Sequence, residues 1–393
     1  MKSLPQKIVI LAALVSAALA YSSEYFSASA CTKVRQRVPW TSLTKEEKKS
    51  YIQADLCLMK APSKLGIPGA VTRWDDIQWP HVVQTASVHF VGAFLPFHRY
   101  YMTAHERLIR DECGYTGRYP YWDEPADIGK LAQSELWSDE YFGGDGTGPG
   151  GCIETGPFAN LTLRWTQDKR SVPHCLVRRF NELALTLASN ASRERCNALD
   201  NFVDAWNCLE TGPHGSGHGA VGGLMSDPTL SPGDPIFYLH HSWLDKLWWE
   251  WQKGNSSKRL SDVGGLNTPS FGSFPGGPSS GFPNGTFPGF PGNGSFPGFP
   301  GNGSFPGFPG NGSFPGLPGN GSFPGFPGNG SFPGIPGFGL GGGGPEFSEY
   351  FGDNGNWTTL NHRLYMAEIF PNITIGDVMN VNGDVVCSEY LNA

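Results

Sequence analysis

The stretch GDPIFYLHHSWLDKLWWEWQ, residues 233–252, joins a helix-start signal to a long apolar and aromatic run that contains two adjacent histidines. Asp234 can cap exposed backbone donors, and Pro235 suits the first helical position, so we predict that the rest of the stretch is helical. Adjacent residues on a helix point about 100° apart. We therefore expect only one of His240 and His241 to face a shared point inside the fold.

A second pair of histidines precedes this stretch, in ETGPHGSGHGAVGG. His214 and His218 are four residues apart, which on a helix places both imidazoles on one face, one turn apart. This spacing is typical of metal chelation. The intervening glycines form a poor helix in isolation, so we expect the surrounding fold or a metal to hold it.

A third group lies in WPHVVQTASVHFVGAFLPFHRYYMTAHERLIRDECGY, which contains His81, His89 and His98. Pro96 is predicted to start a new helix that carries His98. The other two histidines precede that break, so three imidazoles must converge from two segments, as a site built between helices requires.

Six imidazoles in two sets of three, with no thiolate or carboxylate in either set, suit copper, zinc, iron or nickel better than calcium or magnesium. Burying so many polar rings without a shared partner would be costly, which favours metal sites. We interpret the remaining His105, His174 and His362 as hydrogen-bonded core residues.

The N-terminus, MKSLPQKIVILAALVSAALA at residues 1–20, has the lysines, apolar run and small terminal residues of a secretory signal. All 8 cysteines follow it, and an even number in an exported chain predicts disulfides. Several glycosylation sequons fit the same compartment. The net charge of −7 without basic clusters argues against nucleic-acid binding, and no later segment is long and apolar enough to span a membrane. We predict a secreted protein.

Residues 255–345 form a block in which a nine-residue unit such as NGSFPGFPG recurs from Asn284. Its glycines and prolines oppose helix and strand, so we predict a disordered insertion. We interpret it as a sugar-decorated spacer; a sharper hypothesis is an adhesive segment that contacts a cell wall or matrix. Apolar spacing returns afterwards, so residues 21–254 and 346–393 are predicted to be two parts of one domain.

The three histidine segments together resemble the type-3 copper proteins, which are tyrosinases, catechol oxidases and haemocyanins, and most of all short secreted fungal tyrosinase-like proteins. This resemblance implies a mainly α fold in which a four-helix bundle with long loops and disulfides holds two copper ions, with dioxygen and a phenolic small molecule as reaction partners. It assigns the second histidine of the adjacent pair to copper and places His240 in the pocket wall. The implied ligands are His81, His89 and His98 for one copper and His214, His218 and His241 for the other.

The resemblance also implies roles for residues beside the ligands. Arg99 and Asp245 correspond to a buried ion pair that ties two metal-bearing helices together. Some relatives crosslink a cysteine two residues before the second ligand to that ligand, whereas this chain has Ser87 there, so no such thioether is expected.

Three further positions bear on substrate. Glu210 matches a glutamate that orders a water near the second copper and helps to remove the phenolic proton. Gly215 replaces the asparagine of several efficient monophenol hydroxylases, which favours catechol oxidation. Pro228 falls where relatives place a gate residue over the second copper.

The leading hypothesis is therefore a secreted copper-dependent oxidase that converts phenols or o-diphenols to o-quinones, with diphenols favoured, in pigment or specialised-metabolite biosynthesis. One alternative is a non-enzymatic oxygen-binding protein like haemocyanin. A second alternative is a matrix or wall component that acts through its repeats.

Overall fold

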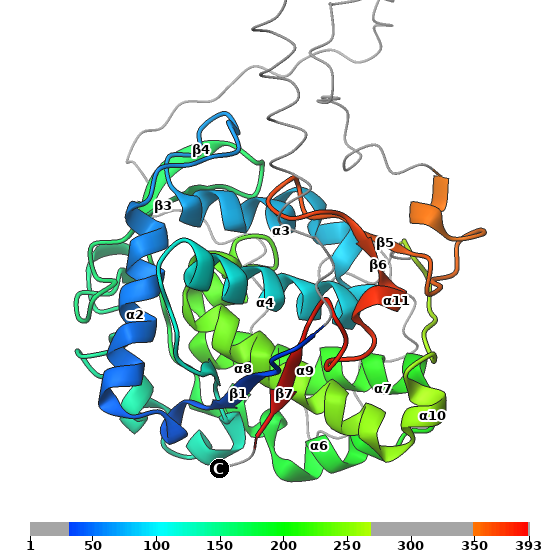
Figure 1. The fold of residues 1–393 in the computed structure, drawn as a ribbon. Coiled ribbons are helices and arrows are strands. Elements are labelled where there is room, and N and C mark those ends of the chain that lie inside the picture. The colour runs from blue at the N-terminus through cyan, green and yellow to red at the C-terminus, as the bar shows by residue number, and fades with distance from the viewer. Residues whose placement is uncertain (1–30, 269–348, 392–393) are drawn as a thin grey trace, which may run out of the picture.

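The structure is a computed structural model that describes residues 31–268 and 349–391. The predicted signal at residues 1–20 and the nine-residue repeats lie outside these described residues. The described chain is mainly helical, with α4, α8 and α9 at its centre and the remaining elements around them (Figure 1). This arrangement agrees with the predicted fold class.

The helices vary widely in length, and the two longest, α9 with 19 residues and α4 with 18, both carry histidines. In chain order, the α-helices of the described residues are α2 (Lys45–Lys60), α3 (Arg73–Val88), α4 (Phe94–Asp111), α5 (Glu182–Leu185), α6 (Asn190–Asn197), α7 (Phe202–Leu209), α8 (Gly215–Val221), α9 (Ile236–Gly254), α10 (Ser256–Arg259) and α11 (Ile375–Val378).

Helix α9 is formed by the aromatic stretch with the adjacent histidines. It begins at Ile236, one residue later than predicted, with Pro235 as its N-cap, and the Oδ1 of Asp234 accepts a hydrogen bond from the backbone N of Ile236 at 3.2 Å. The helix packs along α4, so its apolar side chains are buried. The predicted start of α4 at Pro96 is wrong, because α4 begins at Phe94. A proline is tolerated within the first turn, where backbone donors have no acceptor inside the helix.

Helix α3 brings two of the histidines together by means of a kink. Thr72 and Asp75 form a capping box at its start, Pro80 lies inside it, and Gln84 has non-helical angles, with φ of −127° and ψ of 21°. His81 precedes the kink and His89 follows the last helical residue. The kink turns the end of the helix, so two residues eight positions apart can meet the histidine of α4.

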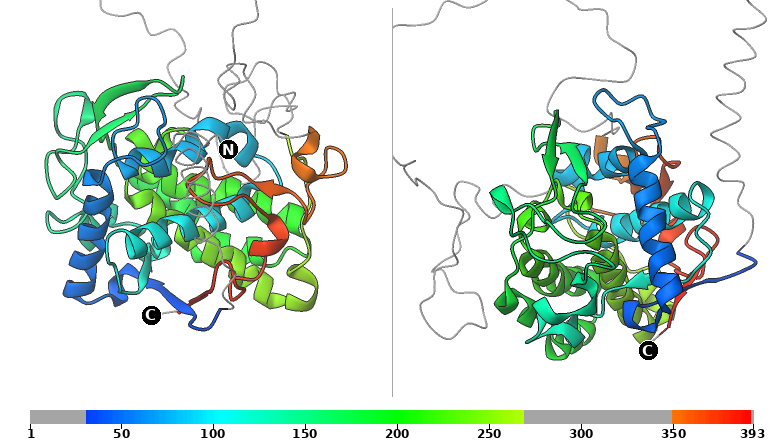
Figure 2. Two further views of the ribbon diagram at one scale, coloured as in Figure 1. Left: turned by 45° about the horizontal axis from the view of Figure 1, so that its top comes forward. Right: turned by 90° about the vertical axis from the view of Figure 1, so that its left-hand side faces the viewer.

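A parallel three-stranded sheet joins the two ends of the described chain. Strand β1 (Arg35–Pro39) lies between β2 (Tyr119–Tyr121) and β7 (Ser388–Tyr390). Figures 1 and 2 show β1 in blue beside the red C-terminal segment. The other strands form two short hairpins, β3 (Thr162–Trp165) with β4 (Ser171–Cys175) and β5 (Arg363–Leu364) with β6 (Ile373–Thr374). The C-terminal segment is thus part of the same fold as the histidine helices.

The two sides of the undescribed stretch 269–348 meet each other. Leu266 pairs with Trp357 in an isolated bridge, and the Nδ2 of Asn267 donates to the Oδ2 of Asp353 at 2.9 Å. Residues 255–268, which the sequence analysis places in the insertion, are described and include α10. The described fold therefore continues past residue 254.

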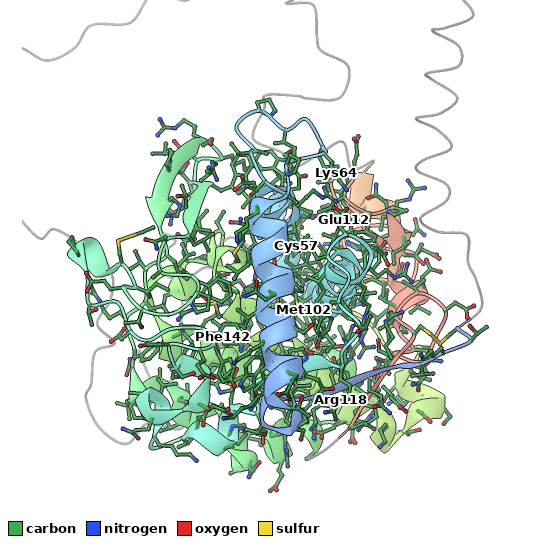
Figure 3. All side chains as sticks on the ribbon, turned by 60° about the vertical axis from the view of Figure 1, so that its left-hand side comes forward. Cys57, Lys64, Met102, Glu112, Arg118 and Phe142 are labelled. Carbon is green, nitrogen blue, oxygen red and sulfur yellow. A yellow bond between two sulfur atoms is a disulfide. The ribbon has the colours of Figure 1, made fainter. Side chains whose placement is uncertain are left out.

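All eight cysteines are paired, as predicted. The bonds are Cys31–Cys387, Cys57–Cys113, Cys152–Cys175 and Cys196–Cys208. The first ties β1 to the C-terminal segment, and the second ties the end of α2 to the residues after α4, near Lys64 and Glu112 (Figure 3). Because no cysteine is free, the thioether crosslink is excluded. Within residues 31–268 and 349–391, the helices are too short or too polar to cross a membrane.

Candidate metal centre

The first histidine cluster consists of His81 on α3, His89 after α3, and His98 on α4. Their ring centroids lie 4.9 to 5.6 Å apart, and the nitrogens that they offer lie within 4.8 Å of one another. All three side chains are buried. The structure thus brings together the three residues predicted as the first ligand set.

Backbone carbonyls orient the three rings of this cluster. The Nδ1 of His81 donates to the Thr229 oxygen at 3.2 Å, and the Nδ1 atoms of His89 and His98 donate to the carbonyls four residues earlier, both at 2.9 Å. A carbonyl can only accept, so Nδ1 carries the hydrogen and Nε2 carries the lone pair. The Nε2 atoms of His81 and His98 are buried and have no hydrogen-bond partner among the described residues.

The second cluster contains His214, His218, His240 and His241. His214 ends a π-helical turn, Glu210–His214, that leads directly into α8, and such turns are frequent at functional sites. The Nδ1 atoms of His214 and His218 donate to the carbonyls of Glu210 at 3.1 Å and Met225 at 2.5 Å. His214 is the N-cap of α8 and His218 lies within it, with their ring centroids 4.5 Å apart, so their predicted position one turn apart is confirmed.

The expectation that only one of the adjacent pair faces the shared point is wrong. His240 and His241 both offer a nitrogen to the second cluster, within 4.8 Å of the others. Their rings are 4.9 Å apart and nearly perpendicular, at 77°. The backbone directions of neighbouring residues diverge, but an imidazole is long enough for both rings to turn back toward the same volume.

The two clusters face each other. The rings of His98 and His241 stack at 4.3 Å with an interplanar angle of 11°. Phe94 contacts both sides, with its ring 4.7 Å from His98 and 4.7 Å from His214. Helices α3, α4, α8 and α9 thus surround one buried volume lined by imidazoles.

Burial keeps these imidazoles neutral. It lowers the pKa of His89 and of His218 to about 4, and it lowers the pKa values of the other cluster members well below their usual range, with neighbouring imidazoles adding to the effect. Neutral imidazoles are the form that binds a metal.

The donor set fits a first-row transition metal. The Nε2 atoms of His218 and His241 lie 3.2 Å apart. Two imidazole nitrogens about 2.0 Å from one tetrahedral metal would be about 3.3 Å apart. Among the described residues, neither cluster includes a thiolate or a carboxylate ligand, which favours copper or zinc over calcium or magnesium. The orphaned Nε2 atoms explain why so many polar rings are buried here.

Residues 71–254 match the protein family described as "Common central domain of tyrosinase". The tyrosinase-like protein phomQ1' of Diaporthe leptostromiformis is 36% identical over 266 residues, which cover 60% of this chain and 68% of that protein. The chain belongs to the tyrosinase family. Tyrosinase ustQ of Aspergillus flavus is 32% identical over 249 residues, 60% of this chain and 68% of that protein. The matched region therefore spans about two thirds of these tyrosinase relatives.

The fold of this tyrosinase-family chain also resembles a solved structure, a polyphenol oxidase (mutant G292N) from Thermothelomyces thermophila. The likeness has a TM-score of 0.65 at 24% identity and covers 91% of this chain and 89% of the other. Family and fold together place this chain among the type-3 copper proteins and point to a copper oxidoreductase.

The expected ion pair between α4 and α9 is present, and it includes more residues than predicted. Arg99 Nε on α4 lies 2.5 Å from Asp245 Oδ1 on α9. Asp245 Oδ2 also accepts from Arg37 of β1 at 3.0 Å and from the Tyr390 hydroxyl of β7 at 2.6 Å. One carboxylate therefore connects both histidine helices to the terminal sheet.

Glu210 lies in the π-helical turn and is buried. Its Oε1 accepts from the backbone N of Phe90 at 2.8 Å and its Oε2 from Trp206 Nε1 at 2.6 Å. Phe90 follows His89 and has a positive φ of 56°. Glu210 thus links the second cluster's segment to the first cluster's loop. Burial raises its pKa to about 8, against the effect of its two donors.

Gly215 and Pro228 occupy different environments. Gly215 is the first residue of α8, and a Cβ built there would meet only the Glu210 carbonyl oxygen, at 3.8 Å, so the position has room for a side chain. Pro228 is exposed, and the next residue, Thr229, accepts the hydrogen bond from His81. The loop of Pro228 is therefore attached to the first cluster.

The other histidines are hydrogen-bonded, and His105 and His362 are core residues as interpreted from the sequence, whereas His174 is only half-buried. His105 contacts Asp55 at 3.1 Å and Tyr119 at 2.8 Å, and His362 contacts Asp353 at 2.6 Å. His174 lies 3.1 Å from each of two backbone carbonyl oxygens.

Sequence reasoning missed Glu124, which hydrogen-bonds to the Nδ1 of His240. Glu124 is fully buried, and burial raises its pKa well above the usual range, with Asp123 and Asp127 adding to the effect. No local pattern marks this residue, because its partner is 116 positions away.

Proposed function

We propose that the chain is a secreted copper-dependent oxidase that converts o-diphenols, and phenols less readily, to o-quinones with dioxygen. The proposal rests mainly on the two facing clusters of buried or half-buried, neutral imidazoles, in which the Nε2 atoms of His81, His98 and His214 have no hydrogen-bond partner among the described residues. His81, His89 and His98 would hold one copper, and His214, His218 and His241 the other. The substrate would be a phenolic precursor of a pigment or specialised metabolite.

Two copper ions held in these clusters would carry electrons, two at a time, from the substrate to dioxygen, which is reduced to water as two diphenols are oxidised. The chain fixes every proposed ligand ring except that of His241 through Nδ1, so the lone pairs of those rings already point inward before a metal binds. Phe94 and Phe237 fill the space beside the imidazoles, with Phe237 4.1 Å from His241, and exclude water from it.

Glu210 is the proposed acceptor of the substrate's phenolic proton, at a carboxylate oxygen. Its raised pKa of about 8 makes its ionised form a stronger base than an exposed glutamate, and this form predominates above about pH 8. Phe90 N and Trp206 Nε1 hold the group in place meanwhile. Gly215 has no side chain that could assist removal of this proton, which supports the preference for diphenols. A diphenol already carries both hydroxyl groups, whereas a monophenol must first gain an oxygen atom.

Metal analysis of the secreted protein, combined with oxygen uptake on a catechol and on its monophenol, tests this proposal. We expect two coppers per chain, rapid catechol turnover and a negligible monophenol rate. We expect Gly215→Asn, which the space around the position permits, to raise the monophenol rate. Reversible oxygen binding without turnover would instead favour an oxygen carrier, and background uptake across a phenol panel with copper bound would refute the oxidase.

Secretion is a separate part of the proposal. Four disulfides suit an oxidising compartment, and they join segments throughout the described chain. Expression of the full chain should release a protein that begins near residue 21 into the medium. Retention of an uncleaved N-terminus inside the cell would contradict this part alone.

A further inference from the structure

Three buried polar side chains outside both histidine clusters have no part in the proposed chemistry. The Nε2 of His105 lies 3.1 Å from Asp55 Oδ1, and its Nδ1 lies 2.8 Å from the hydroxyl of Tyr119. All three side chains are 0% exposed. A carboxylate can only accept, so Nε2 carries the hydrogen and Nδ1 accepts from the Tyr119 hydroxyl. This tautomer is the opposite of the one in His89 and His98, whose Nδ1 atoms donate.

Tyr119, His105 and Asp55 together provide a base for a phenolic proton. Burial raises the pKa of Asp55, although the hydrogen bond from His105 opposes the effect, so this carboxylate is a stronger base than an exposed one. Burial also raises the pKa of Tyr119 well above its usual range, so the phenol is protonated at rest. Apolar side chains of similar volume commonly stabilise a core as well as a buried ionisable pair does. Packing alone therefore does not account for these residues.

His105 and Tyr119 lie in a row of aromatic rings that starts at the first cluster. The ring of Tyr101 is 6.0 Å from that of His81, at an angle of 21°, and 6.0 Å from that of Tyr238. Tyr238 stacks on His105 at 3.8 Å with an angle of 17°. The rings of His105 and Tyr119 are 5.9 Å apart. Short steps thus lead from a proposed copper ligand to Tyr119.

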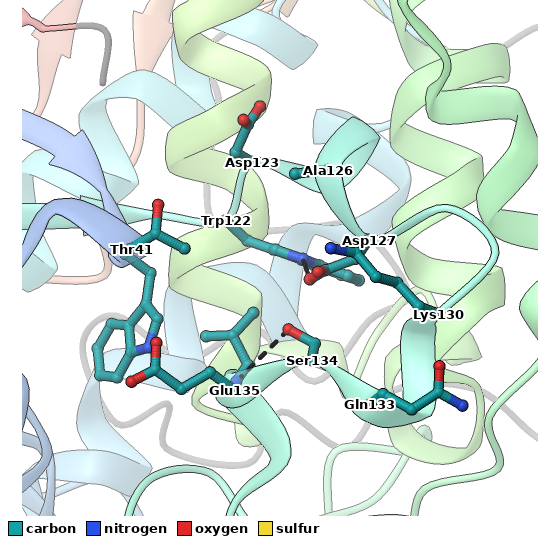
Figure 4. A pocket seen from close by; sticks show the side chains of 11 residues that line it. Thr41, Trp122, Asp123, Ala126, Asp127, Lys130, Gln133, Ser134 and Glu135 are labelled. Atoms are coloured by element: carbon teal, nitrogen blue, oxygen red, sulfur yellow. Dashed lines mark hydrogen bonds between the residues drawn. The ribbon is translucent and has the colours of Figure 1, made fainter.

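The row continues from Tyr119 to the surface. The ring of Tyr51 is 6.0 Å from that of Tyr119 and 6.2 Å from that of Trp40. Trp40 lines a surface cavity of about 190 Å³ together with Trp122 and acidic side chains such as Asp127 (Figure 4). Each member of this aromatic row is at most 2% exposed, and the members are Tyr101, Tyr238, His105, Tyr119, Tyr51 and Trp40.

Tyr119 is the tyrosine of the aromatic row best suited to lose an electron. A phenol that loses an electron becomes a strong acid, so its proton needs a base at hydrogen-bond distance, which Tyr119 has. The Tyr101 hydroxyl donates instead to the Ile77 carbonyl, and the Tyr51 hydroxyl has no hydrogen-bond partner among the described residues. The Arg37 guanidinium lies 5.5 Å from the Tyr119 ring and disfavours a positive charge there, which loss of the proton avoids.

We propose that Tyr119, His105 and Asp55 form a redox-active tyrosine site through which a diphenol at the surface cavity delivers an electron to the copper centre. Tyr119 loses one electron toward the first cluster, and its phenolic proton passes to Nδ1 of His105. A neutral phenoxyl radical and an imidazolium beside Asp55 result. The oxidant is dioxygen at the proposed copper site, so the inference rests on the proposed function.

The second step restores Tyr119. The diphenol gives one electron to the row through Trp40 and Tyr51 and one proton to water. Tyr119 takes up that electron, and His105 returns the proton to it. The copper centre thereby gains a source of electrons when no phenol occupies it, which spares its own histidines from oxidation.

Flash photolysis of the metal-free, full-length protein with tris(bipyridine)ruthenium(II) and a cobalt(III) electron acceptor tests the tyrosine site without copper. The oxidised ruthenium complex is a cation, which the acidic side chains of the cavity attract, and it removes one electron from the protein. We expect the EPR spectrum of a tyrosyl radical that is coupled to an exchangeable deuteron in heavy water. Tyr119→Phe should abolish this signal. His105→Phe should remove the deuteron coupling, and it decides the question if Tyr119→Phe does not fold.

Tyr100→Phe is the matched control, because Tyr100 is equally buried, lies outside the row and donates to the Pro371 carbonyl, which is not a base. This variant should keep the signal. A radical that is absent from the wild type, or unchanged in folded Tyr119→Phe, would overturn the inference. Catechol should reduce the radical faster in the wild type than in Tyr51→Phe, and equal rates would overturn the route from the cavity.

Hydrogen peroxide added to the copper-loaded wild type without a phenol should produce the same radical. Its absence from a protein that holds two coppers and oxidises catechol would overturn the link between Tyr119 and the copper centre. A protein that binds no copper, yet forms the Tyr119 radical with ruthenium, would refute the proposed function and leave the redox-active tyrosine in place.

Discussion

Replacing Asp245 by asparagine removes the charge that joins the two central helices to the terminal sheet. Its oxygens accept from Arg99 at 2.5 Å, Arg37 at 3.0 Å and Tyr390 at 2.6 Å. Asp245 is 3% exposed and both arginines are 0% exposed. Removing one partner of a buried ion pair costs about 3–5 kcal/mol, because the other charge stays buried. We expect a loss near 5 kcal/mol, since two guanidinium groups are affected, although Arg37 keeps Glu106 at 3.2 Å.

Urea unfolding of the metal-free protein with intact disulfides, followed by tryptophan fluorescence, measures this loss. A typical domain has only about 5–15 kcal/mol of stability, so the effect takes a large share. Asp168→Asn is the matched control, because its pair with Arg170 is exposed and screened by water, so the free energy of unfolding should stay close to that of the wild type. Metal content should fall as well, since Asp245 lies one turn after His241. A loss below about 1 kcal/mol with full metal content would refute the reasoning.

Three further perturbations probe other parts of the molecule. Gly217→Ala should lose one bound metal per chain, because its Cβ would collide with His240 and Glu124. Gly215→Ala should retain two metals, because the nearest atom to its Cβ is 3.8 Å away. Equal metal contents in the two variants would contradict this prediction. Cys387→Ser removes a disulfide between residues 356 positions apart and should lower the free energy of unfolding by about 5 kcal/mol. Denaturation of the metal-free variant and of the metal-free wild type measures this difference. Removal of the metals with a chelator should lower the Tm, and restoring free metal to about 100 times its Kd should recover about 2.7 kcal/mol per site; an unchanged Tm would mean that the clusters bind no metal.

Helix periodicity could predict the spacing of His214 and His218, whereas the ligand sets followed from the family resemblance and the meeting of His81 with His89 depends on the kink in α3. His214 and His218 fall one turn apart even though π-helical geometry leads into α8. The bond between Arg99 and Asp245 followed from a family resemblance, but the participation of Arg37 did not, because β1 reaches α9 only through the tertiary fold.

Other features depend on packing that no local pattern encodes. The pairing of Glu124 with His240 joins residues 116 positions apart. The orientation of His240 and His241 was wrongly expected because backbone direction was treated as the position of the ring. The imidazole is separated from the backbone by two rotatable bonds, so its position is not set by the backbone direction alone. The absence of a side chain at Gly217 leaves the space that the ring of His240 occupies.

The contact between Leu266 and Trp357 has a consequence for how the repeats change in number. The described residues on the two sides of positions 269–348, a stretch of 80 residues, meet at one place and bond to each other there. The entropy of closing a loop grows only with the logarithm of its length, so one extra nine-residue unit among 80 costs about 0.1 kcal/mol. Replication slippage within the repeated DNA could therefore lengthen or shorten the array while the copper domain keeps its stability, which leaves the number of repeats free to differ between closely related strains.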